Sequence, residues 1–281
     1  MELIADGGST KVDWVVLDDH KKELLRVRSE GLNPAIVSKE ELKERLLQVK
    51  ELIDIKEKVS AIYFYGAGCG TPKPLKILKE LFEEVFKQAS VYVAEDMLAA
   101  VYAASFNKES VVCILGTGSN SCYYNGEAIE GMIPSLGYTV MDEASGNYFG
   151  KLLLRDYFYK KMPKKMRASF EKEFDLNPDV IKENLYKKAN PNRYLASFST
   201  FMFTFKEEKY IKRLIKKGFT TFLEKRVCVY EKSKEVPVYF IGSIAFYFED
   251  LLRKASKKKG LEIKEIIQRP LDNLIKYHQQ V

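Results

Sequence analysis

The sequence lacks the cysteine patterns from which metal sites and disulfide frameworks are built. Its four cysteines, among 281 residues, stand far apart, and none forms a Cys-x-x-Cys pair. Zinc sites and disulfide-stabilised domains depend on such spacings, so we predict neither. Reduced thiols are typical of the cytoplasm, which is where we expect this protein to act.

Long apolar runs are also lacking. No run approaches the about 20 residues that a membrane-spanning helix needs, and the N-terminus begins with a predicted strand instead of the basic and apolar regions of a signal peptide. The net charge is +7, yet the lysine-rich stretches, 160–165 and 257–259, have no interleaved aromatic residues. Such stretches are typical of solvated helix faces, so we predict neither a membrane nor a nucleic-acid partner.

What the chain does have is the composition of a globular protein, with 46% hydrophobic and 30% charged residues. Its length favours two domains, each with its own core. Buried strands at 59–65 and 91–93 alternate with helical patterns, and the chain opens with an antiparallel hairpin. This order predicts an α/β architecture whose sheet is partly parallel.

The opening hairpin carries a turn suited to phosphate. A strand at 3–5 reaches Asp6, and the chain returns as a strand at 12–18. Backbone N–H groups and hydroxyls in the turn can hold phosphate, glycines allow close approach of a ligand, and the carboxylate suits water-mediated Mg²⁺. An ordinary hairpin turn also favours such residues, here Gly7, Gly8, Ser9, Thr10 and Lys11.

A second strand-turn-strand begins at Ser110. A strand at 111–115 leads into the turn 116–121, Gly-Thr-Gly-Ser-Asn-Ser, and a strand at 122–124 returns. Chance turns seldom repeat a whole hairpin plan. We therefore predict an internal duplication that provides two phosphate-type turns.

Three further loops stand out. Asp96 follows the strand at 91–93 and opens a helix of small residues, where it could be a general base or simply cap the helix. The polar loop 137–146 leads into another helix, and the turn 242–245, Gly-Ser-Ile-Ala, would let a flat ring lie against the backbone.

In this order, the loops resemble those of the sugar kinase, Hsp70 and actin superfamily, and within it those of the BadF-type (BadF/BadG/BcrA/BcrD) ATPases, of which N-acetylglucosamine kinases are the best understood. Each motif alone is weak, but five occur in order over nearly the whole chain: 6–11, 95–96, 116–120, 137–146 and 242–245.

The resemblance implies an α/β fold of two ribonuclease-H-like (actin-like ATPase) domains, with ATP and sugar in the cleft between them. We expect the N-terminal domain at 1–107, joined by the C-terminal helical segment 264–281. The second domain, with a helical insertion, is expected at 108–263.

The resemblance also implies roles for individual residues. Asp96 would be the catalytic base, and Asp6 would hold Mg²⁺. ATP would contact both glycine turns and the adenosine motif: Gly7, Gly8, Ser9, Thr10, Lys11, Gly116, Thr117, Gly118, Gly242 and Ser243. Amides and carboxylates give directional hydrogen bonds to hydroxyl groups, and the sugar would contact Asn33, Asn120, Gly137 and Asp142.

Two of the sugar residues also have plainer interpretations. Asn33 precedes Pro34 and suits a turn, and Asp142 or Ser145 suits a helix cap. Asn120 lies next to the second phosphate turn, from which it could reach either ATP or the sugar. Leu136 and Tyr138 flank Gly137 where family members often carry Gly-Trp or Gly-Gly, so the resemblance leaves the identity of the sugar open.

The implied activity is that of an ATP-dependent kinase acting on the 6-hydroxyl of N-acetylglucosamine or a closely related N-acetylated amino sugar, in a homodimer. N-acetylmuramic acid is an alternative substrate. A different class is also open, because some BadF-type proteins are ATPase activators of dehydratases or reductases, with an iron–sulfur cluster held by cysteines of two subunits. Cys113 and Cys122 flank the second turn.

Overall fold

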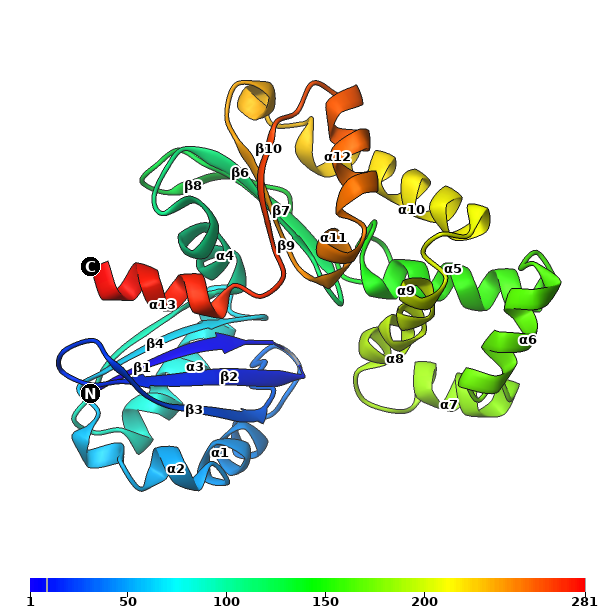
Figure 1. Ribbon diagram of the computed structural model, residues 1–281. Helices are drawn as coiled ribbons and strands as arrows, with labels where there is room; N and C mark the ends of the chain where they lie inside the picture. Colours follow the sequence, from blue (N-terminus) through cyan, green and yellow to red (C-terminus); the bar gives the residue numbers. More distant parts are fainter. Residues whose placement is uncertain (9, 281) are drawn as a thin grey trace. The chain divides into compact units, whose positions relative to one another are not determined.

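The computed structural model describes residues 1–8 and 10–280 and divides into two compact units (Figure 1). Unit 1 comprises Met1–Phe106 and the C-terminal segment from Pro270, and unit 2 comprises Asn107–Arg269. Each unit contains one five-stranded sheet with helices packed against it. The predicted α/β fold class is confirmed.

The sheet of unit 1 has the strand order β3-β2-β1-β4-β5. β1 pairs antiparallel with β2, and β2 with β3, whereas β1 pairs parallel with β4, and β4 with β5. The C-terminal ends of β1, β4 and β5 therefore meet at one edge. The strands are β1 (Glu2–Gly7), β2 (Lys11–Leu17), β3 (Glu23–Glu30), β4 (Ala61–Gly66) and β5 (Ser90–Glu95).

Helices cover both faces of this sheet, because successive side chains of a strand point to opposite sides. Leu3 of β1 belongs to a core with Trp14 and Phe82, and its neighbour Ile4 belongs to a second core with Leu274. The helices are α1 (Lys39–Leu47), α2 (Lys50–Ile53), a 3₁₀ turn (Lys56–Lys58), α3 (Pro72–Val85), α4 (Asp96–Ser105) and α13 (Leu271–Gln280).

The C-terminal helix α13 packs beside α4 and closes the second core (Figure 1). The Tyr277 ring stacks on Tyr102 with centroids 4.2 Å apart. The next residue of the same helix, His278, is buried, and its Nε2 lies 3.0 Å from the hydroxyl oxygen of Tyr65. Burial lowers the pKa of His278 from 6.5 to about 4; the charge of Glu2 opposes this shift slightly, and the charge of Lys21 adds to it slightly.

This histidine should make stability fall in acid. Because the pKa is lower in the folded chain, the unfolded chain binds the proton first as the pH falls below 6.5. Relative to a His278→Gln variant, we expect the wild type to lose about 3 kcal/mol of unfolding free energy between neutral pH and pH 4. Urea denaturation of both proteins measures this. Because both proteins have the same carboxylates, the contribution of these groups to the pH dependence cancels in the comparison. A difference in unfolding free energy between wild type and variant that does not change with pH would contradict the prediction.

The sheet of unit 2 repeats the plan of the first. Its order is β10-β9-β6-β7-β8, with β6 antiparallel to β7, β7 antiparallel to β8, and β6, β9 and β10 parallel. The whole sheet is therefore duplicated, as the paired hairpins predicted. The strands are β6 (Ser110–Leu115), β7 (Ser119–Tyr124), β8 (Ile129–Met132), β9 (Val238–Ile241) and β10 (Ile263–Ile267).

The long segment between β8 and β9 is mostly helical, as predicted. Prolines start its helices: Pro163 precedes α6, and Pro178 and Pro191 occupy the first turns of α7 and α8. The helices of unit 2 are α5 (Gly146–Phe158), α6 (Lys164–Glu173), α7 (Pro178–Tyr186), α8 (Pro191–Ser197), α9 (Phe201–Thr204), α10 (Lys209–Phe222), α11 (Ser243–Tyr247) and α12 (Glu249–Lys258). Shorter turns are 3₁₀ at Phe198–Thr200 and Glu231–Lys234 and π-helical at Leu223–Val227.

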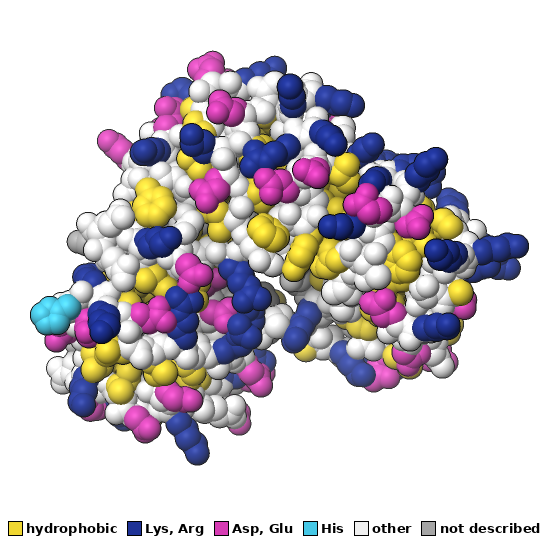
Figure 2. All heavy atoms as spheres, in the orientation of Figure 1, with side chains coloured by type: hydrophobic (Ala, Val, Ile, Leu, Met, Phe, Trp, Pro, Cys, Tyr) yellow, Lys and Arg dark blue, Asp and Glu magenta, His cyan; other side chains and the backbone are white. Residues whose placement is uncertain are grey.

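The charged surface fits the solvated faces that the sequence predicted. Figure 2 shows Lys and Arg side chains mixed with Asp and Glu over the visible face. The lysines of the stretch 160–165 are all exposed. Among the described residues, every helix is too short or too polar to cross a membrane.

Candidate functional site

The turn between β1 and β2 in unit 1 is held by backbone hydrogen bonds. The N–H of Gly8 donates to the carbonyl of Lys11 at 2.8 Å, and the carbonyl of Thr10 accepts from Gly31 at 3.0 Å. Gly7 also has a packing reason to be glycine, since a Cβ there would lie 2.5 Å from the ring of Phe64. Ser9, predicted to bind phosphate, lies outside the described residues.

Asp6 and Asp96 come together at this edge of the sheet, at the end of β1 and at the first residue of α4. Burial, followed by the charges of Asp96 and Asp13, raises the pKa of Asp6 to about 7. Burial also raises the pKa of Asp96 to about 6, although backbone N–H groups of Asp96 and Met97 donate to its carboxylate and oppose the shift. Both carboxyl groups therefore titrate near neutral pH, where a general base works best.

The position of Asp96 reconciles its two interpretations. It opens α4, and its carboxylate accepts hydrogen bonds from the first amides of the helix. It also lies close enough to Asp6 for its charge, after burial, to raise the pKa of that residue, so helix-start chemistry and a catalytic role are compatible.

Two neighbours of this pair, Cys69 and Glu95, were assigned no role from the sequence. Burial raises the pKa of the Cys69 thiol to about 12, with smaller effects of Asp96 and Glu95, and burial followed by Asp96 also raises the pKa of Glu95. Cys69 follows the C-terminal end of β4, and Glu95 is the last residue of β5. Because parallel strands end at one edge, the predicted sheet could have placed them there.

Lys11 makes an ion pair in unit 1. Its Nζ lies 2.6 Å from a carboxylate oxygen of Asp13, whose other oxygen is 2.6 Å from Arg28. Burial raises the pKa of Asp13, but the hydrogen bonds from Lys11 and Arg28 outweigh it and hold the pKa below its ordinary value. Binding of phosphate by Lys11 would compete with this pair.

Asn33 is buried at a turn, as its plainer interpretation predicted. Its Oδ1 accepts from the N–H of Ala35 at 2.9 Å. Gly68, at φ +84°, passes so close that a Cβ would lie 2.0 Å from the same oxygen. Asn33 is thus positioned against the loop that carries Cys69.

The second glycine turn, in unit 2, is held by the N-terminus of α5. The N–H of Gly146 donates to the carbonyl of Gly116 at 2.8 Å, and the N–H of Asn147 donates to Thr117 at 3.0 Å. The turn closes on itself through a 3.0 Å bond from Gly116 to Gly118. These bonds leave the Thr117 side chain exposed.

Asp142 braces this turn from the loop 137–146. Its carboxylate accepts from the N–H of Ser119 at 3.3 Å and from Nδ2 of Asn147 at 2.7 Å. The residue is buried and adopts a left-handed backbone at φ +67°. The cap of α5 is Ser145, whose Oγ accepts from Tyr148, so the cap interpretation applies to Ser145 and not to Asp142.

Gly242 lies against the end of β6. Its φ is +118°, and a Cβ would lie 2.3 Å from the carbonyl oxygen of Leu115 and 3.0 Å from the nitrogen of Gly116. Ser243 then starts α11. The predicted adenosine motif and the second glycine turn are therefore in contact within unit 2.

Gly137 and Asn120 complete the predicted set. Gly137 has φ +76° with nothing within 4 Å of a Cβ, so backbone conformation alone favours glycine. Asn120 Oδ1 accepts from Arg226 at 2.7 Å, a partner that the sequence did not indicate.

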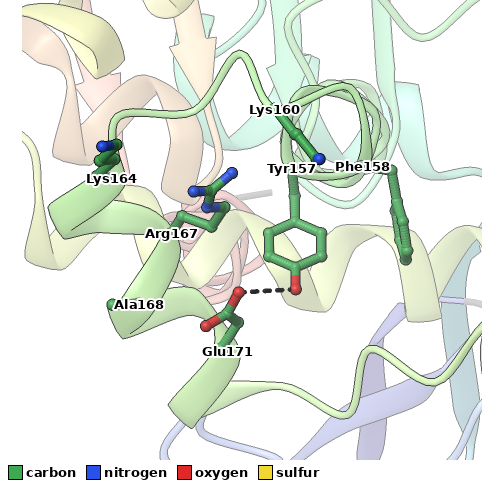
Figure 3. Close-up of a pocket in the computed structure, with 7 residues that line it drawn as sticks. All are labelled: Tyr157, Phe158, Lys160, Lys164, Arg167, Ala168 and Glu171. Carbon is green, nitrogen blue, oxygen red and sulfur yellow. Dashed lines mark hydrogen bonds between the residues drawn. The ribbon is translucent and has the colours of Figure 1, made fainter.

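Among the cavities of unit 2 are two of about 520 Å³ each. In the first, the hydroxyl of Tyr157 donates to Glu171 at 2.9 Å (Figure 3). The second shares Val140, Met141 and Glu143 with the loop 137–146. Neither cavity is lined by residues of the two glycine turns.

Solved structures similar to this chain cover its full length. A Porphyromonas gingivalis protein that carries the provisional name N-acetylglucosamine kinase is 36% identical, with a TM-score of 0.92 over 100% of this chain and 99% of that one. A Chromobacterium violaceum protein with the same provisional name is 13% identical, with a TM-score of 0.75 over 98% of each chain.

A ROK family glucokinase of Streptomyces griseus, solved with glucose and AMPPNP, is 14% identical, with a TM-score of 0.59 over 99% of each chain. This likeness and that of the Chromobacterium protein show a shared fold. No model of a known protein family matches the chain, and no curated protein matches it in sequence.

Proposed function

Because the chain belongs to the N-acetylglucosamine kinase-like family of the sugar kinase, Hsp70 and actin superfamily, we propose that it transfers the γ-phosphoryl group of ATP to the 6-hydroxyl of N-acetylglucosamine or a closely related N-acetylated amino sugar. The predicted actin-like ATPase fold and the kinase class are confirmed. The observation that carries the proposal is the 36% identity along the full chain, and the meeting of Asp6 with Asp96 supports it.

In the proposed reaction, Asp96 is the general base. Its carboxylate takes the proton from the sugar hydroxyl as the new P–O bond forms. The pKa of about 6 suits this task, because the group is largely ionised at neutral pH yet basic enough to accept a proton. Direct attack of the positioned hydroxyl needs no covalent enzyme intermediate.

Asp6 is proposed to hold Mg²⁺ through water. One carboxylate together with substrate phosphates is a common set of ligands for this ion. The residues fit, because burial, followed by the charges of Asp96 and Asp13, raises the pKa of Asp6, and a bound cation would relieve the repulsion between these carboxylates. The ion supplies neutralising charge for the phosphates.

The two glycine turns are proposed to hold the phosphates. Backbone N–H groups and hydroxyls of such turns can donate to phosphate oxygens. The residues proposed are Gly7, Gly8, Ser9, Thr10 and Lys11 from one turn and Gly116, Thr117 and Gly118 from the other. Gly242 and Ser243 are proposed to contact the adenosine. The amino sugar is assigned to Asn33, Asn120, Gly137 and Asp142.

The iron–sulfur alternative is not favoured. Cys113 and Cys122 lie on neighbouring strands β6 and β7, and both are buried. A cluster held by cysteines of two subunits requires thiols that reach the surface. N-acetylmuramic acid stays within the proposed substrate class, and a cytoplasmic homodimer stays a prediction.

Release of ADP in the presence of different sugars tests the proposal. We expect N-acetylglucosamine or another N-acetylated amino sugar to raise the rate at least about tenfold above the rate without sugar, and plain hexoses to raise it less. An ATPase rate that no sugar in the panel stimulates would contradict the proposed function.

A further inference from the structure

Arg226 is a buried arginine to which no described residue offers a carboxylate partner. It lies in the π-helical turn Leu223–Val227 after α10, and only 4% of the residue is exposed. The neighbouring Lys225 pairs with Glu143, but none of the ion pairs found among the described residues includes Arg226. Burial of an unpaired charge is costly, so its contacts call for an explanation.

The guanidinium contacts one residue of the proposed sugar site, Asn120, and the chain neighbour of another, Met141. Its Nη2 donates to Oδ1 of Asn120 at 2.7 Å, and its Nη1 lies 3.9 Å from the sulfur of Met141, next to Asp142. The backbone carbonyl of Arg226 accepts from the hydroxyl of Ser121 at 2.6 Å. One residue of unit 2 thus joins β7 to the loop 137–146.

These contacts fix the orientation of the Asn120 amide. Its Oδ1 accepts from both Arg226 and the N–H of Ser121, the latter at 2.9 Å. Both partners are donors, so the oxygen must face them and the NH₂ group must face away. Within the part of the chain that the structure describes, the partner found for Nδ2 is the sulfur of Met132, at 4.0 Å, which is a weak acceptor. Asn120 is half-buried, so these donors can reach a ligand.

We propose that Arg226 is a positioning residue for the sugar: its guanidinium holds Asn120 as a donor toward an acceptor oxygen of the substrate. This inference rests on the proposed function. Arg226 itself is too buried for extensive contact with a ligand. It acts through Asn120, and its contact with Met141 helps to hold the loop 137–146 in position.

The energetics separate this role from simple packing. Methionine has a similar length and no charge, so Arg226→Met removes the cost of burying the guanidinium, and such replacements are often neutral or stabilising. Asn120 Oδ1 keeps its bond from Ser121, and the backbone bond to Ser121 is unaffected. A packing role predicts loss of stability, whereas a positioning role predicts loss of sugar affinity at equal or higher stability.

The test compares Arg226→Met with Arg253→Met, which removes an arginine of α12 paired with Glu249. For Arg226→Met we expect the KM for the amino sugar to rise at least about tenfold, the KM for ATP to stay within about twofold, and the Tm to stay equal or rise. Arg253→Met should leave both KM values unchanged. In the Asn120→Ala background, Arg226→Met should have little further effect, because the two residues act as one.

An unchanged sugar KM, or a sugar KM and stability that worsen together, would overturn the inference. A crystal structure of Arg226→Met can be determined without substrate. It therefore tests the positioning of Asn120 even if the proposed kinase function is wrong. If the wild type phosphorylates no sugar, the proposed function is wrong, and the structure still decides the positioning step. A rotated or disordered Asn120 amide supports it, and an unchanged amide overturns it.

Discussion

Replacing Asp96 with Asn is expected to lower kcat for sugar phosphorylation by about 10²- to 10⁴-fold, the usual contribution of a positioned general base. The amide has nearly the same shape but cannot take the proton of the 6-hydroxyl. KM values should change little, because Asn can still donate and accept hydrogen bonds. Steady-state kinetics measure the effect, and a kcat near the wild-type value would remove Asp96 from the role of base.

Folding should survive this substitution. Burial raises the pKa of Asp96 to about 6, so its charged form is disfavoured in the folded chain. The neutral amide avoids that cost, and stability at neutral pH should be equal or higher. Thermal unfolding of the variant is therefore the control: an unchanged or higher Tm shows that the lower kcat does not come from unfolding.

The same carboxylates predict the acid limb of the pH–rate profile. Activity requires ionised Asp96, so kcat/KM should rise with pH through about 6. The pKa of Asp6 is about 7 in the protein without a cation, and a cation favours the ionised form. Increasing Mg²⁺ should therefore shift the limb to lower pH. A flat profile across this range would contradict the assignment of both residues.

The second large effect is expected on stability, at Gly242. An alanine there would adopt φ +118° and place its Cβ 2.3 Å from the backbone carbonyl of Leu115. Neither the unfavourable φ nor the clash with the backbone can be relieved by a side-chain rotation. We therefore expect Gly242→Ala to lower the unfolding free energy by about 3 kcal/mol or more. Because the displaced backbone leads directly into Gly116, the KM for ATP should rise as well.

Gly137→Ala is the matched control. Its φ of +76° is also left-handed, but a Cβ there has nothing within 4 Å. It should cost only the conformational part, about 1–2 kcal/mol. Urea denaturation of the two variants isolates the clash, and equal costs would show that the contact with Leu115 is unimportant.

The sequence was sufficient for the central strands and for both hairpin turns, because these are marked by continuous apolar runs and by glycines. It did not indicate β3, β8 or β10, which lie at the edges of their sheets. Charged residues such as Arg26 and Arg28 in β3 and Lys264 in β10 interrupt their apolar patterns. Charged edge strands limit aggregation, and the same feature hides them from pattern analysis.

The candidate site was predictable where its residues follow directly from strand ends, as with Asp6 and Asp96. Arg226 was not, since 106 positions separate it from Asn120 and it lies in a lysine-rich helical stretch that resembles a solvated face. Only the fold shows that the Arg226 side chain is buried. The bracing of the second turn by Asp142 is likewise a tertiary contact.

The most direct test of the central claim is the identity of the reaction product. The purified protein is incubated with ATP, Mg²⁺ and N-acetylglucosamine, and the product is analysed by ³¹P–¹H correlation NMR. We predict a sugar monophosphate whose phosphorus couples to the protons on carbon 6, formed by the wild type and nearly absent with Asp96→Asn. A phosphorus coupled to the anomeric proton, or no phosphorylated sugar with any N-acetylated amino sugar, would contradict the account.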